Sequence, residues 1–249
     1  MMINFFRKIR ENMIKENRVS KYILYAIGEI VLVVIGILIA LSINNWNEQK
    51  KTEEKTKSSL LALRNDLILD TLLINKNLPE IKFQFQLNES LRTRIAKPKA
   101  TLDTLIQIAR YEFNPNWNDQ IIYNTNAYNS LNQTGLIENL PDTLKTLIKN
   151  FYNRKFQLNN MVERITTDYR SKVADYVDTY TFGSTSLHDQ GPLIDSLVWH
   201  EVNPDHLAAK FQGISNFKRI LFSSNLEDME NALNNSRILL RQLNQYLSL

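Results

Sequence analysis

The stretch from Tyr22 to Ile43 constrains the fold most, because it is almost entirely apolar and Glu29 is its one charged residue. It consists mainly of Ile, Leu and Val, with two glycines and no proline. A bilayer is crossed by about 20 predominantly apolar residues in a helix, and a continuous helix satisfies every backbone polar group inside the lipid. The sequence therefore predicts a transmembrane helix over residues 22–43.

A cleaved secretory signal is the alternative, because Ala40-Leu41-Ser42 superficially fits a small-x-small cleavage site. The apolar region of a signal peptide runs for about 7–15 residues, which is shorter than this stretch, and it seldom carries an acid. We therefore expect the helix to be retained as a membrane anchor.

Charge is concentrated before the span. Residues 1–21 hold six basic and two acidic residues, a net charge of +4, and the whole chain, with 30 Lys+Arg and 26 Asp+Glu, is also +4. Everything from Tyr22 onward therefore balances, which indicates a positive-inside signal and headgroup contact rather than nucleic-acid binding. We expect residues 1–21 to be cytoplasmic and residues 44–249 to lie outside, although the lysines at 50, 51, 55 and 57 weaken the charge bias.

Both ends of the span carry residues typical of the membrane interface. Arg18 and Lys21 precede the span, Tyr22 is its first residue, and Trp46 follows it. We predict that these four side chains anchor the helix at the headgroups. Residues 1–21 also place Met2, Phe5, Phe6, Ile9 and Met13 at three- and four-residue steps, which favours an amphipathic helix at the surface; a disordered basic tail is the alternative.

Within the span, Glu29, Gly36 and Ala40 fall on one face, within about 20° of a line along the helix. Gly36 and Ala40 form a small-xxx-small pair, which lets another helix approach closely. Intramembrane acids almost always face protein or water. We therefore predict that this face contacts another transmembrane helix, of the same protein or of another subunit. Snorkelling of Glu29 toward the headgroups is the alternative.

This N-terminal region resembles an uncharacterised family of bacterial single-pass membrane proteins, described as a domain of unknown function. The resemblance rests on the Phe/Arg/Lys-rich start, the Gly28-Glu29 pair, Gly36 and the motif from Asn44 to Asn47 (Asn-Asn-Trp-Asn). A weaker match lies at Ala127, Tyr128, Leu131, Thr134-Gly135-Leu136-Ile137 and Phe151-Tyr152. The resemblance implies an inner-membrane protein with a helical periplasmic domain, and it implies no activity.

Residues 44–249 are predicted to form a helical bundle, so the fold class is all-α. An apolar stripe comprises Leu60, Leu63, Leu67, Ile74, Leu78, Ile81 and Phe85. Pro79 is expected to kink this helix or to end it near Asn77. Further helices are expected at 102–109, at 117–133 with Gly135 in the left-handed conformation after it, from a cap at Asn139 toward Phe182, at 205–222 and at 226–246. A long loop with at most one short element is expected at about 183–205.

The longest of these helices, from Asn139 toward Phe182, is expected to bury an apolar face. That face comprises Leu144, Leu147, Ile148, Phe151, Leu158, Met161, Ile165, Val173 and Val177.

Signs of chemistry are scarce. The chain has no cysteine, no Gly-rich phosphate loop and no His-Glu-x-x-His pair. His188, His200 and His206 lie near Asp189, Asp195, Glu201 and Asp205, but their spacing fits no metal-site template. Asp168, Tyr169, Arg170, Asp175 and Asp178 are interpreted as an exposed helix face. The aromatic residues Tyr123, Tyr128, Phe151, Tyr152 and Phe156 are interpreted as core, although an aromatic pocket between helices is where a small ligand would bind.

These observations predict a non-enzymatic, membrane-anchored protein without a cofactor, whose helical domain binds a partner or assembles with itself. The first alternative is an accessory subunit of a membrane complex for signalling, transport or energy coupling that acts through Glu29. A second is a metal-dependent hydrolase that uses the loop from His188 to His206.

Overall fold

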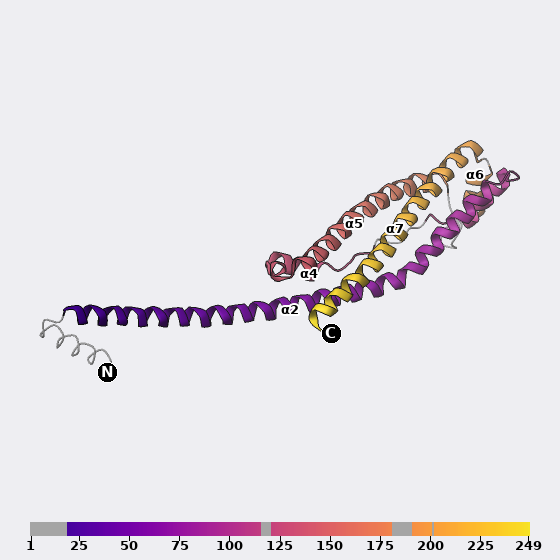
Figure 1. Ribbon diagram of the computed structural model, residues 1–249. Coiled ribbons are helices and arrows are strands. Elements are labelled where there is room, and N and C mark those ends of the chain that lie inside the picture. Colours follow the sequence, from indigo (N-terminus) through magenta and orange to yellow (C-terminus); the bar gives the residue numbers. More distant parts are fainter. Residues whose placement is uncertain (1–18, 116–120, 181–190, 201) are drawn as a thin grey trace. The chain divides into compact units, whose positions relative to one another are not determined.

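The computed structural model describes residues 19–115, 121–180, 191–200 and 202–249. Every regular element within them is a helix, and the all-α fold predicted from the sequence is confirmed (Figure 1). The elements are α2 (Val19–Ile95), α3 (Leu102–Gln107), the π-helix η1 (Ile108–Glu112), α4 (Asn126–Gln133), the 3₁₀-helix η2 (Leu136–Asn139), α5 (Asp142–Val177), α6 (Gly191–Trp199) and α7 (Pro204–Leu247). The chain divides into two compact units, residues 1–56 and residues 57–249.

In the first unit, α2 contains one segment long and apolar enough to cross a membrane, and no part of that window is buried within the chain. The large apolar side chains from Ile23 to Ile43 are between 47% and 75% exposed. A helix from the core of a soluble protein buries such side chains instead. The predicted amphipathic segment before Arg18 lies outside the described residues.

The second unit is built from the C-terminal half of α2 together with α5 and α7. Helices α5 and α7 run alongside each other (Figure 1). The predicted stripe on α2 is confirmed. Leu60, Leu63, Leu67, Ile74 and Ile81 are buried, and Leu78 and Phe85 are half-buried against the core. Their three- and four-residue spacing keeps one face of the helix toward α5 and α7.

The core of this unit consists of three clusters. One joins Leu60, Leu63 and Leu67 to Ile148 of α5 and Leu239 of α7, and a second joins Ile74 and Ile81 to Tyr123, Phe222, Met229 and Leu233. The third contains Leu91, Ile108, Phe113, Tyr169, Tyr176, Trp199, Leu207 and Phe211. All of these residues belong to 57–249, so the unit has a hydrophobic core of its own.

One of the two alternatives expected at Pro79 is excluded, and the break expected between residues 222 and 226 is wrong. The helix does not end near Asn77, because α2 continues through Pro79 to Ile95. Pro79 is exposed and removes one backbone hydrogen bond, whereas the neighbouring Ile74 and Ile81 are buried in the core. The two helices predicted at 205–222 and 226–246 are one helix, α7. Phe222 and Asn225, at the expected break, are both buried, so packing continues through it.

Two other boundaries also differ. Residues 121–125 are not helical, so the predicted 117–133 helix shortens to α4. Pro141 occupies the N-cap position of α5 without a side-chain cap bond, in place of Asn139. The stretch 183–205, expected to be a loop with at most one short element, contains the nine-residue helix α6; its residues 183–190 and 201 lie outside the described part. Gly135 has φ +70°, which confirms the left-handed residue after α4.

Most of the apolar face predicted for α5 is confirmed. Its residues from Leu144 to Val173 are buried or half-buried, but Val177 is 38% exposed. Phe182 lies outside the described residues.

Candidate functional site

Residues 113–115 and 121–125 are not helical, so the backbone polar groups that they bury need partners other than helical hydrogen bonds. Side chains of the long helices supply the partners. The Asn124 N–H donates to Asp70 Oδ1 at 2.9 Å, and the Tyr169 hydroxyl donates to the Pro115 carbonyl at 2.7 Å. Beyond these residues, the Ala127 N–H donates to Asp66 Oδ2 at 3.2 Å. This bonding keeps residues 121–125 out of a helix.

Two buried lysines donate to backbone carbonyls of these non-helical residues. Lys155 of α5 donates to the Asn124 carbonyl at 3.3 Å, and Lys218 of α7 donates to the Asn114 carbonyl. Lys218 is 2% exposed, lies 5.4 Å from the Phe113 ring centre, and donates to Gln84 Oε1 at 3.4 Å. Burial lowers the pKa of Lys218 to about 8.

Lys155 also forms a buried ion pair with Asp70 of α2. Its Nζ lies 2.6 Å from Asp70 Oδ2, and the two side chains are 6% and 1% exposed. The ammonium lies 4.6 Å from the centre of the Tyr123 ring and 5.1 Å from that of Tyr152, which adds cation–π attraction. Burial lowers the pKa of Lys155, and the Asp70 carboxylate opposes that shift.

A second carboxylate, that of Asp228 on α7, lies close to this pair. Asp228 is 8% exposed, and its Oδ2 accepts a hydrogen bond of 3.2 Å from the Tyr123 hydroxyl. Burial raises the pKa of Asp228, whereas the Tyr123 hydrogen bond and the Lys155 charge act in the opposite direction. Burial together with the Asp228 charge raises the pKa of Tyr123 far above its ordinary value. The hydroxyl of Tyr123 therefore remains a hydrogen-bond donor at neutral pH.

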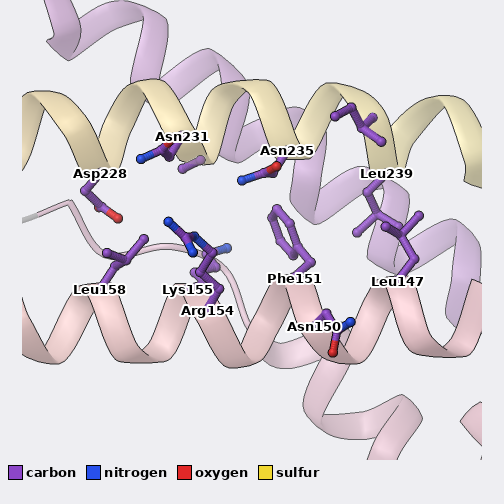
Figure 2. Close-up of a pocket in the computed structure, with 12 residues that line it drawn as sticks. Leu147, Asn150, Phe151, Arg154, Lys155, Leu158, Asp228, Asn231, Asn235 and Leu239 are labelled. Carbon is purple, nitrogen blue, oxygen red and sulfur yellow. The ribbon is translucent and has the colours of Figure 1, made fainter.

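Lys155 of α5 and Asp228 of α7 line facing walls of a cavity of about 210 Å³ between the two helices (Figure 2). Twelve residues form its wall, and half of them are apolar. From α5 these are Leu147, Asn150, Phe151, Arg154, Lys155 and Leu158, and from α7 they are Asp228, Asn231, Ala232, Asn235, Ile238 and Leu239. A cavity with an apolar wall and a few polar groups is suited to binding a small organic molecule.

The sequence-based interpretation of the aromatic residues is confirmed for three of them. Tyr123, Tyr128 and Tyr152 are buried, and the last two rings stack with centroids 4.1 Å apart at an angle of 7°. Phe156 is 38% exposed and is not core. Phe151 is half-buried and lines the cavity, so one of the five aromatic residues at which a pocket was expected contributes to its wall.

The interpretation of the α5 charges as an exposed face is correct except at Tyr169. Asp168, Arg170, Asp175 and Asp178 are exposed, whereas Tyr169 is fully buried because its ring fills the third core cluster and its hydroxyl caps a carbonyl.

Sequence reasoning missed Asp70, Lys155 and Asp228. Asp70 carried a signal, because it lies three residues after Leu67 and four before Ile74, on the apolar stripe itself. An acid at such a position requires a buried partner. The chain contains many lysines, however, and no spacing in the sequence identified Lys155 as that partner.

The predicted intramembrane residues all lie on α2. Glu29, Gly36 and Ala40 are exposed within the first unit, and a Cβ added at Gly36 would meet no atom within 4 Å. Trp46 is 65% exposed, with the Lys50 ammonium 5.7 Å from its ring centre. Lys21 and Tyr22 belong to α2, but their side chains, like all of Arg18, are outside the described part of the chain.

The candidate metal loop is described only in part. His188, Asp189, Glu201 and the side chain of Asp195 lie outside the described residues. His206 Nδ1 lies 2.6 Å from the Tyr180 hydroxyl, and His200 is exposed. Among the described residues, no three or more His, Cys, Asp or Glu side chains form a group that could hold a metal ion.

Comparison with known proteins gives one match. No curated protein and no solved structure matches the chain. Residues 29–181, more than half of the chain, match the model of a protein family. The match begins at Glu29 in the apolar span and ends just after α5, so it includes one wall of the cavity and the buried Asp70–Lys155 pair. The chain therefore belongs to DUF6090, a family of unknown function.

Proposed function

We propose that this protein is a non-enzymatic, membrane-anchored binding subunit. In this proposal, residues 22–43 cross the bacterial inner membrane once and pair with a second transmembrane helix. The helical domain of residues 44–249 lies in the periplasm and engages a partner there. The partner in the membrane is either a second copy of the chain or a subunit of a signalling, transport or energy-coupling complex.

The observation that carries the proposal is the exposure of the span. Its large apolar side chains are exposed rather than buried against other described residues, and aliphatic surface of this extent needs lipid or protein around it. Gly36 leaves open space where a side chain would project, and Ala40 lies one turn further on the same face. Small residues at this spacing allow two helix backbones to approach closely.

Glu29 lies on the same helix face and also favours a contact with another protein helix there. On translocon-type scales a charged residue at the centre of a membrane helix costs about 2.5–3.5 kcal/mol, so such residues usually face protein or water. A hydrogen bond from a partner helix would offset that cost. The charge of residues 1–21 supports the orientation, with these residues in the cytoplasm.

Purification of the full chain in mild detergent tests the proposal. We expect a second copy or a stoichiometric membrane protein to co-purify, and Gly36→Leu should abolish this because the larger side chain separates the helices. Val34→Leu, which enlarges a side chain on the opposite face, is the matched control and should retain the partner. Purification of the wild type alone as a monomer, or equal behaviour of the two variants, would contradict the proposal.

A further inference from the structure

The cavity between α5 and α7 differs in character along its length. Lys155, Asp228 and Asn231 lie toward one end together with Leu158, whereas Leu147 and Leu239 lie toward the other end together with Asn150; Phe151 lies between them (Figure 2). Its volume of about 210 Å³ is below the about 300–1,000 Å³ of pockets for drug-sized ligands. The shape and the wall therefore suit a compact molecule with one polar end and one apolar end.

The polar end has an unbalanced negative charge. The Lys155 ammonium is matched by Asp70 at 2.6 Å. Among the described residues, no cation lies within ion-pair distance of Asp228, whose one hydrogen-bond donor is the neutral Tyr123 hydroxyl on Oδ2. A carboxylate that is more than nine-tenths buried is costly without a positive partner. A cationic group entering the cavity would supply that partner.

The other oxygen of this carboxylate, Oδ1, accepts no hydrogen bond from the described residues. Figure 2 shows Asp228 directed from α7 into the space that faces α5, where the ligand would lie. Asn231, one turn further along α7, offers an amide oxygen as a second acceptor. An ammonium group has three donors and no acceptor, which matches two acceptors at the end of a cavity.

We propose that this cavity binds a small primary amine that carries an apolar group. The ammonium donates to Asp228 Oδ1 and to the amide oxygen of Asn231, while the apolar group lies between Phe151 and Leu239. Arg154 also lines the cavity, but it is an exposed residue, so water screens its charge. The inference goes beyond the membrane-pairing proposal, since it assigns a ligand to the soluble unit and does not depend on the span.

The test is calorimetric titration of the full chain in lipid nanodiscs with 2-phenylethylamine, with empty nanodiscs to subtract partition of the amine into lipid. We expect saturable binding of the amine and none of 3-phenylpropanoate, which has the same ring and nearly the same length but carries a carboxylate. Asp228→Asn removes the charge with almost no change of shape, and it should weaken amine binding about 10- to 100-fold.

Glu227→Gln is the matched control, because it removes the same charge at an exposed neighbouring position outside the cavity wall. It should bind the amine as the wild type does. The proposal is overturned if the wild type binds no amine, if the acid binds equally well, or if Asp228→Asn and Glu227→Gln behave alike. Should Asp228→Asn fail to fold, Ala232→Leu fills the cavity and keeps the carboxylate; it too should abolish binding, and unchanged affinity would overturn the proposal.

Discussion

Replacing Lys155 by Met tests whether the buried ion pair with Asp70 holds the soluble domain together. The substitution keeps an unbranched side chain and removes the ammonium, which leaves the Asp70 carboxylate with only the Asn124 N–H and amide donors. It also removes the hydrogen bond to the Asn124 carbonyl. Breaking a buried pair by removing one partner costs about 3–5 kcal/mol of unfolding free energy. For a domain of this size, 1 kcal/mol lowers the Tm by about 2–4 °C, so the Tm should fall by about 6–20 °C.

The assay is thermal and urea unfolding of the 44–249 fragment, followed by circular dichroism, in a double-mutant cycle with Asp70→Asn. Because each single change leaves the other partner buried without its counter-charge, the double variant should lose less than the sum of the two losses, by about 0.5–3 kcal/mol. Lys149→Met is the control, since Lys149 pairs with Glu138 on the surface, where the side chains are 38% and 58% exposed. A loss at Lys155 as small as the expected loss at Lys149, below about 1 kcal/mol, would refute the reasoning.

Three further predictions concern the topology of the chain, the folding of the 44–249 fragment and the pH dependence of its stability. A periplasm-active reporter fused after Leu249 should be active and a cytoplasm-only reporter silent, because residues 1–21 carry the net charge of +4; the reverse pattern would show inverted topology. The 44–249 fragment should fold alone with a helix-dominated circular dichroism spectrum and a cooperative melt, since the three core clusters lie within 57–249; a non-cooperative melt would show that the domain needs its anchor. Lys218, whose pKa burial lowers to about 8, loses its proton in the folded chain at lower pH than in the unfolded chain. Relative to Lys218→Met, the wild type should therefore gain up to about 1.4 kcal/mol of unfolding free energy per pH unit between pH 8 and 10, and parallel stability curves would contradict the assignment.

The sequence predicted those parts of the fold that depend on apolar periodicity. The exposed span and the buried stripe from Leu60 to Ile81 follow directly from which residues are apolar and how they are spaced. Gly135 was identified because a residue without a Cβ readily adopts φ > 0 after a helix. Local signals failed where tertiary packing outweighed them, as at Pro79, and at Phe222 and Asn225, which bury side chains across a predicted break.

The candidate site could be predicted only in part, because its residues are far apart in the sequence. Asp70, Lys155 and Asp228 come from three helices, and their meeting depends on how α2, α5 and α7 align. A buried lysine and an exposed lysine look alike in a sequence, so nothing distinguished Lys155 from Lys149. Two signals were present in the sequence: the position of Asp70 on the apolar stripe, and the aromatic residues, of which Phe151 does line the cavity.

The central claim is that the Glu29–Gly36–Ala40 face of the span contacts protein within the membrane. Crosslinking in native membranes from a single cysteine placed at Ala40, with Leu41 as the off-face position, measures that contact directly, and the absence of native cysteine makes the experiment clean. The account predicts strong crosslinking from Ala40→Cys, weak crosslinking from Leu41→Cys, and loss of the Ala40→Cys product when Gly36→Leu is added. Equal crosslinking from both positions, unaffected by Gly36→Leu, would mean that the span is only an anchor and that Glu29 merely snorkels to the headgroups.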